Sequence, residues 1–175
     1  MTLADLDDLP ADRAAPILQS CCGSSAWVRE MVSRRPFAQI DALLDTADSV
    51  WWSLTREDWL EAFAHHPRLG EARAQSETTS LSRDWSADEQ SRIADSTRDV
   101  RASLANANRA YEARFGFICI ICATGKSADE LLAITRDRLA NTPTAELRMA
   151  AEEQRQITRL RLERLVGTPP APVSA

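Results

Sequence analysis

Apolar residues recur along most of this chain at intervals of three and four, the spacing that gives an α-helix one apolar face. The pattern is clearest in residues 87–115. Counting about 100° per residue from Ile93 places Val100, Leu104 and Tyr111 within about 40° of it, on a single narrow stripe. The pattern predicts helices over residues 3–9, 11–21, 24–33, 36–49, 56–65, 87–115, 128–141 and 143–166.

Capping residues mark the ends of several of these helices. Thr55, Ser86 and Ser127 each stand three residues before an acidic residue, the arrangement of a capping box at a helix start. Pro67 ends the helix that precedes it, and Gly116 can terminate the long helix 87–115. Residues 143–166 begin with a proline in the first turn, where its missing N–H costs nothing.

Three stretches break the helical pattern. Residues 117–122 read FICIIC, an apolar run too short for a helix of its own, which predicts a buried extended segment or a short strand. Residues 70–84 are polar and form a long connection of the kind that is often functional. Residues 168–175 (TPPAPVSA) are typical of a disordered tail. We therefore predict one compact all-α domain over residues 1–167, with one short buried extended segment.

Composition and charge narrow the class of protein. The 175 residues carry 21 basic and 26 acidic side chains, a formal charge of −5, with a single lysine, Lys126. No basic block is available to follow a phosphate backbone, which argues against nucleic-acid binding. No apolar run reaches the length of a membrane span, and the first ten residues lack the pattern of a secretory signal. The cysteines lie in close pairs, 21–22 and 119–122, which favours a reducing, cytoplasmic location over a disulfide framework.

Two histidines, His65 and His66, stand where a helix ends before Pro67. A residue before proline is held outside the α region, so His66 occupies a fixed elbow from which an imidazole can transfer protons near neutral pH. The alternative is that both histidines only cap the last turn. Adjacent histidines do not share a helix face, so a metal site built from both is disfavoured.

Glu89 is the one acidic residue near the start of helix 87–115 that aligns with its apolar stripe, and Gln90 lies on the other flank of that stripe. A simple capping role with Ser86 explains Glu89 equally well. The two interpretations are compatible, because polar groups also converge on an anion at a helix N-terminus.

Arg161 is the clearest anomaly in the last predicted helix. Measured from Ile157, it falls near the middle of the apolar stripe, whereas Arg155 and Arg159 look like ordinary surface residues. A buried guanidinium must either pair with an acid, for which Glu89 is a candidate, or face a pocket that receives an anion.

Two other motifs resemble a phosphate-binding loop and a metal site, but each lacks a required residue. Gly125-Lys126-Ser127 imitates the end of a phosphate-binding loop but lacks the glycine five residues earlier, where Ile120 stands. Cys119 and Cys122 have the spacing of metal ligands, yet they sit among aliphatic residues without a second pair, which favours buried, inert thiols.

Taken together, the motifs resemble one known family. The strings His66-Pro67-Arg68-Leu69-Gly70, Ser86-x-x-Glu89-Gln90, Phe115-Gly116-Phe117 leading into 121–127, and Ile157-Thr158-Arg159-Leu160-Arg161-Leu162 occur in the order found in 2-oxo-4-hydroxy-4-carboxy-5-ureidoimidazoline (OHCU) decarboxylases of urate degradation. The resemblance extends from about residue 35 to 166.

This resemblance implies an all-α enzyme without cofactor or metal, often a homodimer, that converts an anionic ureidoimidazoline to (S)-allantoin. By position, His66 matches the catalytic histidine and Glu89 its acidic partner. The residues that match substrate contacts are Pro67, Ser86, Gln90, Phe117, Ile118, Cys119, Ile120, Ile121 and Arg161. Cys119 stands where the resemblance leads us to expect an aromatic side chain, and Arg68 is assigned no role.

Two other functions remain open at this point. One is a hydrolase of a related ureido compound on the same scaffold, which would release ammonia rather than CO2. The other is a helical protein-interaction module without catalytic activity, in which Arg161 is only a buried ion pair.

Overall fold

The computed structural model describes residues 1–68 and 98–167, and these residues form helices without any strand. The predicted all-α class is therefore confirmed for the described part of the chain. The predicted connection 70–84 and the predicted tail 168–175 lie outside it. The described helices are α1 (Leu3–Asp8), α2 (Ala11–Cys21), α3 (Ser25–Ser33), α4 (Ile40–Ser53), α5 (Arg56–Ala64), α8 (Arg98–Phe115), α9 (Ala128–Arg138) and α10 (Pro143–Val166).

The helix starts follow the capping chemistry that the sequence predicts. At α5 and α9, the hydroxyls of Thr55 and Ser127 accept hydrogen bonds from the third residue of the helix, whose carboxylate in turn accepts one from the cap N–H. Thr142 caps α10, and Pro143 occupies its first turn. The capping box predicted at Ser86 lies outside the described residues, as does the first part of the predicted helix 87–115.

Two of the predicted helices have wrong boundaries. The helix predicted over 36–49 is α4, which begins four residues later and ends at Ser53. The Arg35–Pro36 peptide bond is cis, and the Phe37 N–H donates to the Asp7 carboxylate at 3.0 Å, so this stretch is tied to α1 instead of opening a helix. The helix predicted over 128–141 ends at Arg138, because the next three residues close tighter turns.

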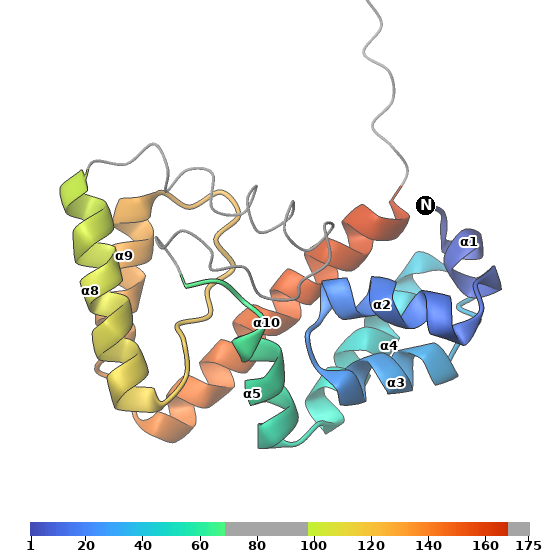
Figure 1. The fold of residues 1–175 in the computed structure, drawn as a ribbon, viewed down its shortest axis with the longest axis horizontal. Coiled ribbons are helices and arrows are strands. Elements are labelled where there is room, and N and C mark those ends of the chain that lie inside the picture. The colour runs from blue at the N-terminus through green and yellow to red at the C-terminus, as the bar shows by residue number, and fades with distance from the viewer. Residues whose placement is uncertain (69–97, 168–175) are drawn as a thin grey trace, which may run out of the picture.

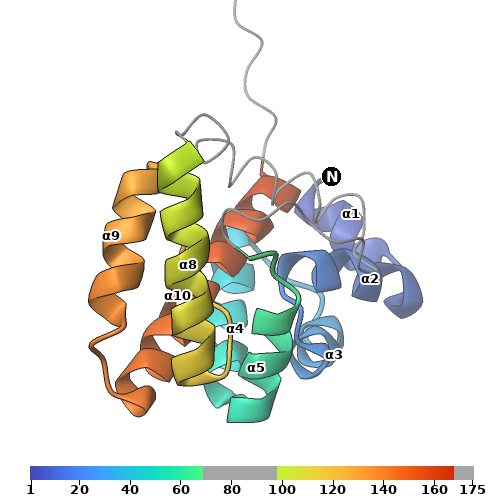
Figure 2. The same cartoon turned by 60° about the vertical axis from the view of Figure 1, so that its left-hand side comes forward.

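The helices form two groups that α10 joins. Helices α1–α4 gather on one side, α8 and α9 pair on the other, and α10 runs diagonally across both (Figures 1 and 2). Helix α5 lies near the middle, in contact with α3 and α10. Arg155 and Arg159 both bind Asp48 of α4, at 2.7 and 3.1 Å, so they are half-buried bridges between helices and not the ordinary surface residues that the sequence indicated.

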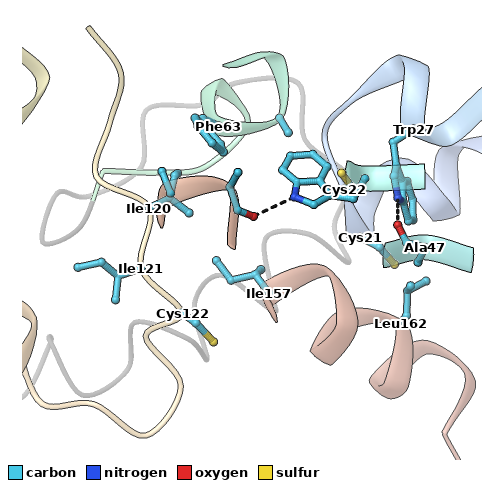
Figure 3. Packing of buried hydrophobic residues seen from close by; sticks show 14 of the residues in the cluster. Cys21, Cys22, Trp27, Ala47, Phe63, Ile120, Ile121, Cys122, Ile157 and Leu162 are labelled. Atoms are coloured by element: carbon cyan, nitrogen blue, oxygen red, sulfur yellow. Dashed lines mark hydrogen bonds between the residues drawn. The ribbon is translucent and has the colours of Figure 1, made fainter. Parts of the chain in front are cut away.

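Tryptophan side chains join α3 to α4 and α4 to α10. Trp27 and Trp51 are almost fully buried, and each indole N–H donates to a backbone carbonyl, of Ala47 at 3.1 Å and Ala151 at 2.9 Å respectively. Figure 3 shows the bond between Trp27 and Ala47 within the apolar core. Buried indoles with satisfied N–H groups fix the registry of α4 against α10, and thereby the position of everything carried on α10. None of the described helices has the length and hydropathy needed to cross a membrane.

Candidate active site

The residues proposed from sequence come from four separate stretches, of which three are described. His66 and Pro67 follow α5, residues 117–121 form the connection after α8, and Arg161 lies on α10. Ser86, Glu89 and Gln90 are outside the described residues, so their roles stay predictions.

The two histidines at the end of α5 have different environments. His65 is the C-cap of the helix and exposed, and its Nδ1 lies 2.9 Å from the Glu61 carbonyl oxygen. His66 is half-buried, and its backbone N–H donates to the Phe63 carbonyl at 3.1 Å. The capping interpretation therefore describes the ring of His65, whereas His66 lies past the helix end, beside Pro67.

The turn between α2 and α3 touches both the end of α5 and α10. A Cβ on Gly23 would stand 2.6 Å from the Cβ of His65, closer than any real contact, so only glycine lets α5 end here. Three residues earlier, the Ser20 carbonyl oxygen accepts a hydrogen bond from Nη1 of Arg161 at 3.4 Å. This turn therefore brings the end of α5 and Arg161 into one neighbourhood.

Arg161 lies on the buried face of α10, as its helical position predicts. It is 4% exposed, and the residues that share its stripe are also buried: Ala150, Gln154, Ile157 and Leu165. Cys21 and Cys22 lie close enough for its charge to act on them, yet burial dominates and raises the pKa of both thiols to about 12. Both thiols therefore stay protonated at neutral pH. Cys119 and Cys122, for which buried thiols were predicted, are also free and buried.

Residues 117–122 form a buried segment without helix or strand, in line with the extended segment expected there. The ring of Phe117 packs on Phe63 of α5 at 5.5 Å, one turn before His66. Figure 3 shows Ile120 on the same side of the chain as Phe63. Among the contacts of the described residues, none of the backbone N–H groups of 117–121 donates a hydrogen bond. Buried N–H groups of this kind are suited to meet an oxyanion.

A buried polar cluster behind this segment was not predicted. Arg138 of α9 donates through Nε to the Glu146 carboxylate at 2.7 Å and through Nη1 to the Ile120 carbonyl at 2.7 Å. Tyr111 also donates to Glu146, and Asn141 does so at 2.7 Å. The signal was present, because Arg138 follows Leu131 by seven residues and so shares its apolar face, the same anomaly that identified Arg161.

The loop after His66 is tied to α8 by an ion pair. Arg68 donates to both carboxylate oxygens of Glu112, at 2.9 and 2.7 Å, and this pairing lowers the pKa of Glu112. A small hollow opens beside this pair, lined by Arg68, Asn108, Glu112, Ile118 and Cys119. No role was predicted for Arg68, and the structure shows it as a tether between the residues after His66 and α8.

No cluster of three or more potential metal ligands occurs among residues 1–68 and 98–167. The three described stretches proposed from sequence contribute the imidazole of His66, the guanidinium of Arg161 and the backbone N–H groups of residues 117–121.

Comparison with known proteins places this arrangement in a family. A family model described as OHCU decarboxylase matches residues 7–163. The chain is 36% identical over 146 residues to the uric acid degradation bifunctional protein TTL of Arabidopsis thaliana, covering 83% of this chain and 45% of that protein. It is 29% identical to a 2-oxo-4-hydroxy-4-carboxy-5-ureidoimidazoline decarboxylase of Haloferax volcanii, covering 93% of this chain and 94% of that one.

Solved structures agree with the sequence relatives. The fold matches a crystal structure of OHCU decarboxylase in the presence of (S)-allantoin with a TM-score of 0.75 and 32% identity, covering 87% of this chain and 99% of that chain. The chain spans less than half the length of the plant bifunctional protein and 32% of a bifunctional relative from Bacillus sp.. The family model covers most of the chain, and we conclude that the chain belongs to the OHCU decarboxylase family.

Proposed function

We propose that this protein decarboxylates 2-oxo-4-hydroxy-4-carboxy-5-ureidoimidazoline to (S)-allantoin in urate degradation, without a cofactor. The observation that carries the proposal is the convergence of three distant stretches: the end of α5 with His66, the buried segment 117–121, and Arg161 on α10. Phe117 packs on α5, and the turn 20–23 contacts both His65 and Arg161. These are the stretches that carry the family resemblance.

The substrate itself supplies the electron sink that other decarboxylases borrow from a cofactor. Its carboxylate is on a ring carbon that also bears a hydroxyl, next to a C=N bond. When the bond to CO2 breaks, its electron pair forms a C=C bond, and the former C=N electrons move to nitrogen, which takes a proton. The hydroxyl loses its proton as CO2 leaves, and the resulting enolate becomes the ring carbonyl when the neighbouring carbon gains a proton and becomes the stereocentre of allantoin.

In this proposal His66, oriented by Glu89, accepts the hydroxyl proton as CO2 leaves. Arg161 binds the anionic substrate, and the N–H groups of segment 117–121, with Pro67, Ser86 and Gln90, hold the ring. Delivery of the last proton to one face sets the S configuration. The apolar surroundings of the segment favour dispersed charge over a hydrated carboxylate.

The direct test supplies freshly generated substrate to the purified protein and follows product chirality by circular dichroism. We expect a signal of (S)-allantoin, with one CO2 released per product and no ammonia. Release of ammonia would instead identify a hydrolase of a ureido group, and no turnover above the spontaneous rate would refute the enzymatic function.

Arg161 separates the enzyme from a purely structural helical module. We expect Arg161→Gln to keep its helical circular dichroism while substrate binding weakens, because a ligand-facing guanidinium acts on the substrate more than on the fold. Global unfolding of this variant, together with wild-type protein that lacks turnover, would favour the structural module.

We also propose that the protein is a cytoplasmic homodimer. The dimer rests on the family resemblance, and light scattering on the purified protein tests it. The location is supported by four cysteines that are all free and buried, as expected in a reducing compartment. Fractionation of cells that express the protein would test this location.

A further inference from the structure

The buried segment 117–122 needs partners for its backbone, because it has no helix or strand ladder to supply them. The described part of the chain provides three charged side chains for this purpose. Arg138 of α9 donates to the Ile120 carbonyl at 2.7 Å, and Glu153 of α10 accepts from the Cys122 N–H at 2.7 Å. Lys126 adds a third bond, to the Cys122 carbonyl at 2.6 Å.

Arg138 is itself rigidly held. It is 4% exposed, and Glu146, its ion-pair partner, is fully buried. The planar guanidinium uses its Nε edge for Glu146 and its Nη1 for Ile120, so one group fixes two elements at a defined angle. Tyr111 donates to the same Glu146 oxygen as Arg138, Oε1, and Asn141 donates to the other oxygen, Oε2. The bond to Ile120 therefore comes from a preorganised donor.

The two anchors act on the same edge of the chain. In extended backbone, residues two apart direct their N–H and C=O groups to the same side. Arg138 and Glu153 bind residues 120 and 122, so the groups of 119 and 121 belong to the opposite edge. No N–H group of residues 117–121 has an acceptor among the described residues, so those of 119 and 121 are available on the edge that the anchors leave uncovered.

We propose that Arg138 and Glu153 are positioning residues of the reaction: by binding the Ile120 carbonyl and the Cys122 N–H, they fix the direction in which segment 117–121 presents its N–H groups to the substrate. This rests on the proposed function, in which those N–H groups bind the ureidoimidazoline. Neither residue touches the reacting atoms. Their effect is on alignment, where an error of about 1 Å can cost on the order of 100-fold in rate.

The test uses Glu153 because it is half-buried and can be replaced with less risk to the fold. Glu153→Ala removes the acceptor, and Glu153→Gln keeps an acceptor oxygen. The matched control is Glu152→Ala, one residue earlier, whose carboxylate binds Arg155 and Gln156 on the same helix and not the segment. Arg138→Lys adds an independent variant, since a single ammonium retains the charge beside Glu146 but cannot serve two acceptors in fork geometry.

Each variant is measured for kcat and KM with freshly generated substrate, for helical circular dichroism, and for amide exchange in residues 117–122. We expect Glu153→Ala and Arg138→Lys to lower kcat/KM by about 10- to 100-fold with the helical signal retained and exchange in the segment accelerated. Glu153→Gln should stay within about threefold of wild type, and Glu152→Ala should be unchanged.

The outcomes separate the two hypotheses. Wild-type protein without turnover refutes the proposed function and this inference with it. Active wild-type protein with Glu153→Ala equal to the Glu152→Ala control overturns the positioning role alone. The positioning role would also be overturned if Glu153→Gln lowered kcat/KM as much as Glu153→Ala. Retaining a hydrogen-bond acceptor at position 153 would then not preserve activity.

Discussion

Replacing Glu146 by glutamine tests the buried cluster that anchors the site. The carboxylate is fully buried and accepts hydrogen bonds from Arg138, Tyr111 and Asn141. An amide has the same shape but lacks the charge, and its NH2 must point either at the Arg138 side or at the Asn141 side. Donors would then face donors in the core, and the Arg138 guanidinium would stay buried without a counter-charge.

The expected loss of unfolding free energy is about 3–5 kcal/mol, the cost of breaking a buried pair by removing one partner. That is a large part of the roughly 5–15 kcal/mol that holds a typical domain folded. Asp48→Asn is the matched control, because Asp48 also accepts from two arginines but retains 24% exposure. For this partly solvated site we expect at most about 1 kcal/mol.

Urea unfolding followed by tryptophan fluorescence measures both variants. A double-mutant cycle with Arg138→Met isolates the pair, because Glu146→Gln should cost much less once the guanidinium is gone. If Glu146→Gln lost no more stability than Asp48→Asn, or if the coupling with Arg138 were below about 1 kcal/mol, the reasoning from buried charge would be refuted.

Three further predictions concern the site and its surroundings. His66→Asn should lower kcat by about 10²–10⁴ with the fold intact, whereas His65→Ala should have little effect. Gly23→Ala should destabilise the protein by about 1–3 kcal/mol, and His65→Gly should restore stability by removing the atoms in conflict. Burial raises the pKa of Cys21 from about 9 to about 12, so iodoacetamide should label this thiol only after unfolding. The unfolded chain loses that proton first as pH rises, so urea titrations should show stability falling between about pH 9 and 12.

Much of the fold was predictable because helix formation depends on residues that are close together in the sequence. The spacing of apolar residues and the capping boxes at Thr55 and Ser127 depend on neighbours within one or two turns, and both boxes are confirmed. The start of α4 was not predictable in this way. It depends on a hydrogen bond from Phe37 to Asp7, about 30 residues away, which no local pattern contains.

The candidate site also combines features that can be predicted from one helix with features that depend on how the helices pack. A charged residue on an apolar stripe is visible in one helix alone, and the burial of Arg161 confirms that reasoning. Its partner cannot be chosen from one helix, because many acids are available and only the packing of helices selects among them. The catalytic roles of His66 and Glu89 therefore stay predictions that the kinetic experiments address.

Arg138 shows what a stricter use of the same rule would have found. It shares the apolar face of Leu131 just as Arg161 shares that of Ile157, but it lies in the last turn of α9, where a basic residue has an ordinary explanation in the helix dipole. Both side chains are 4% exposed, so burial does not separate them, whereas the groups that each guanidinium binds do. Arg138 is committed to Glu146 and to the Ile120 carbonyl, so its charge serves to hold backbone in place. The proposed cofactor-free reaction requires the chain itself to supply catalytic alignment, and the buried ion pair behind segment 117–121 is a rigid way to supply it.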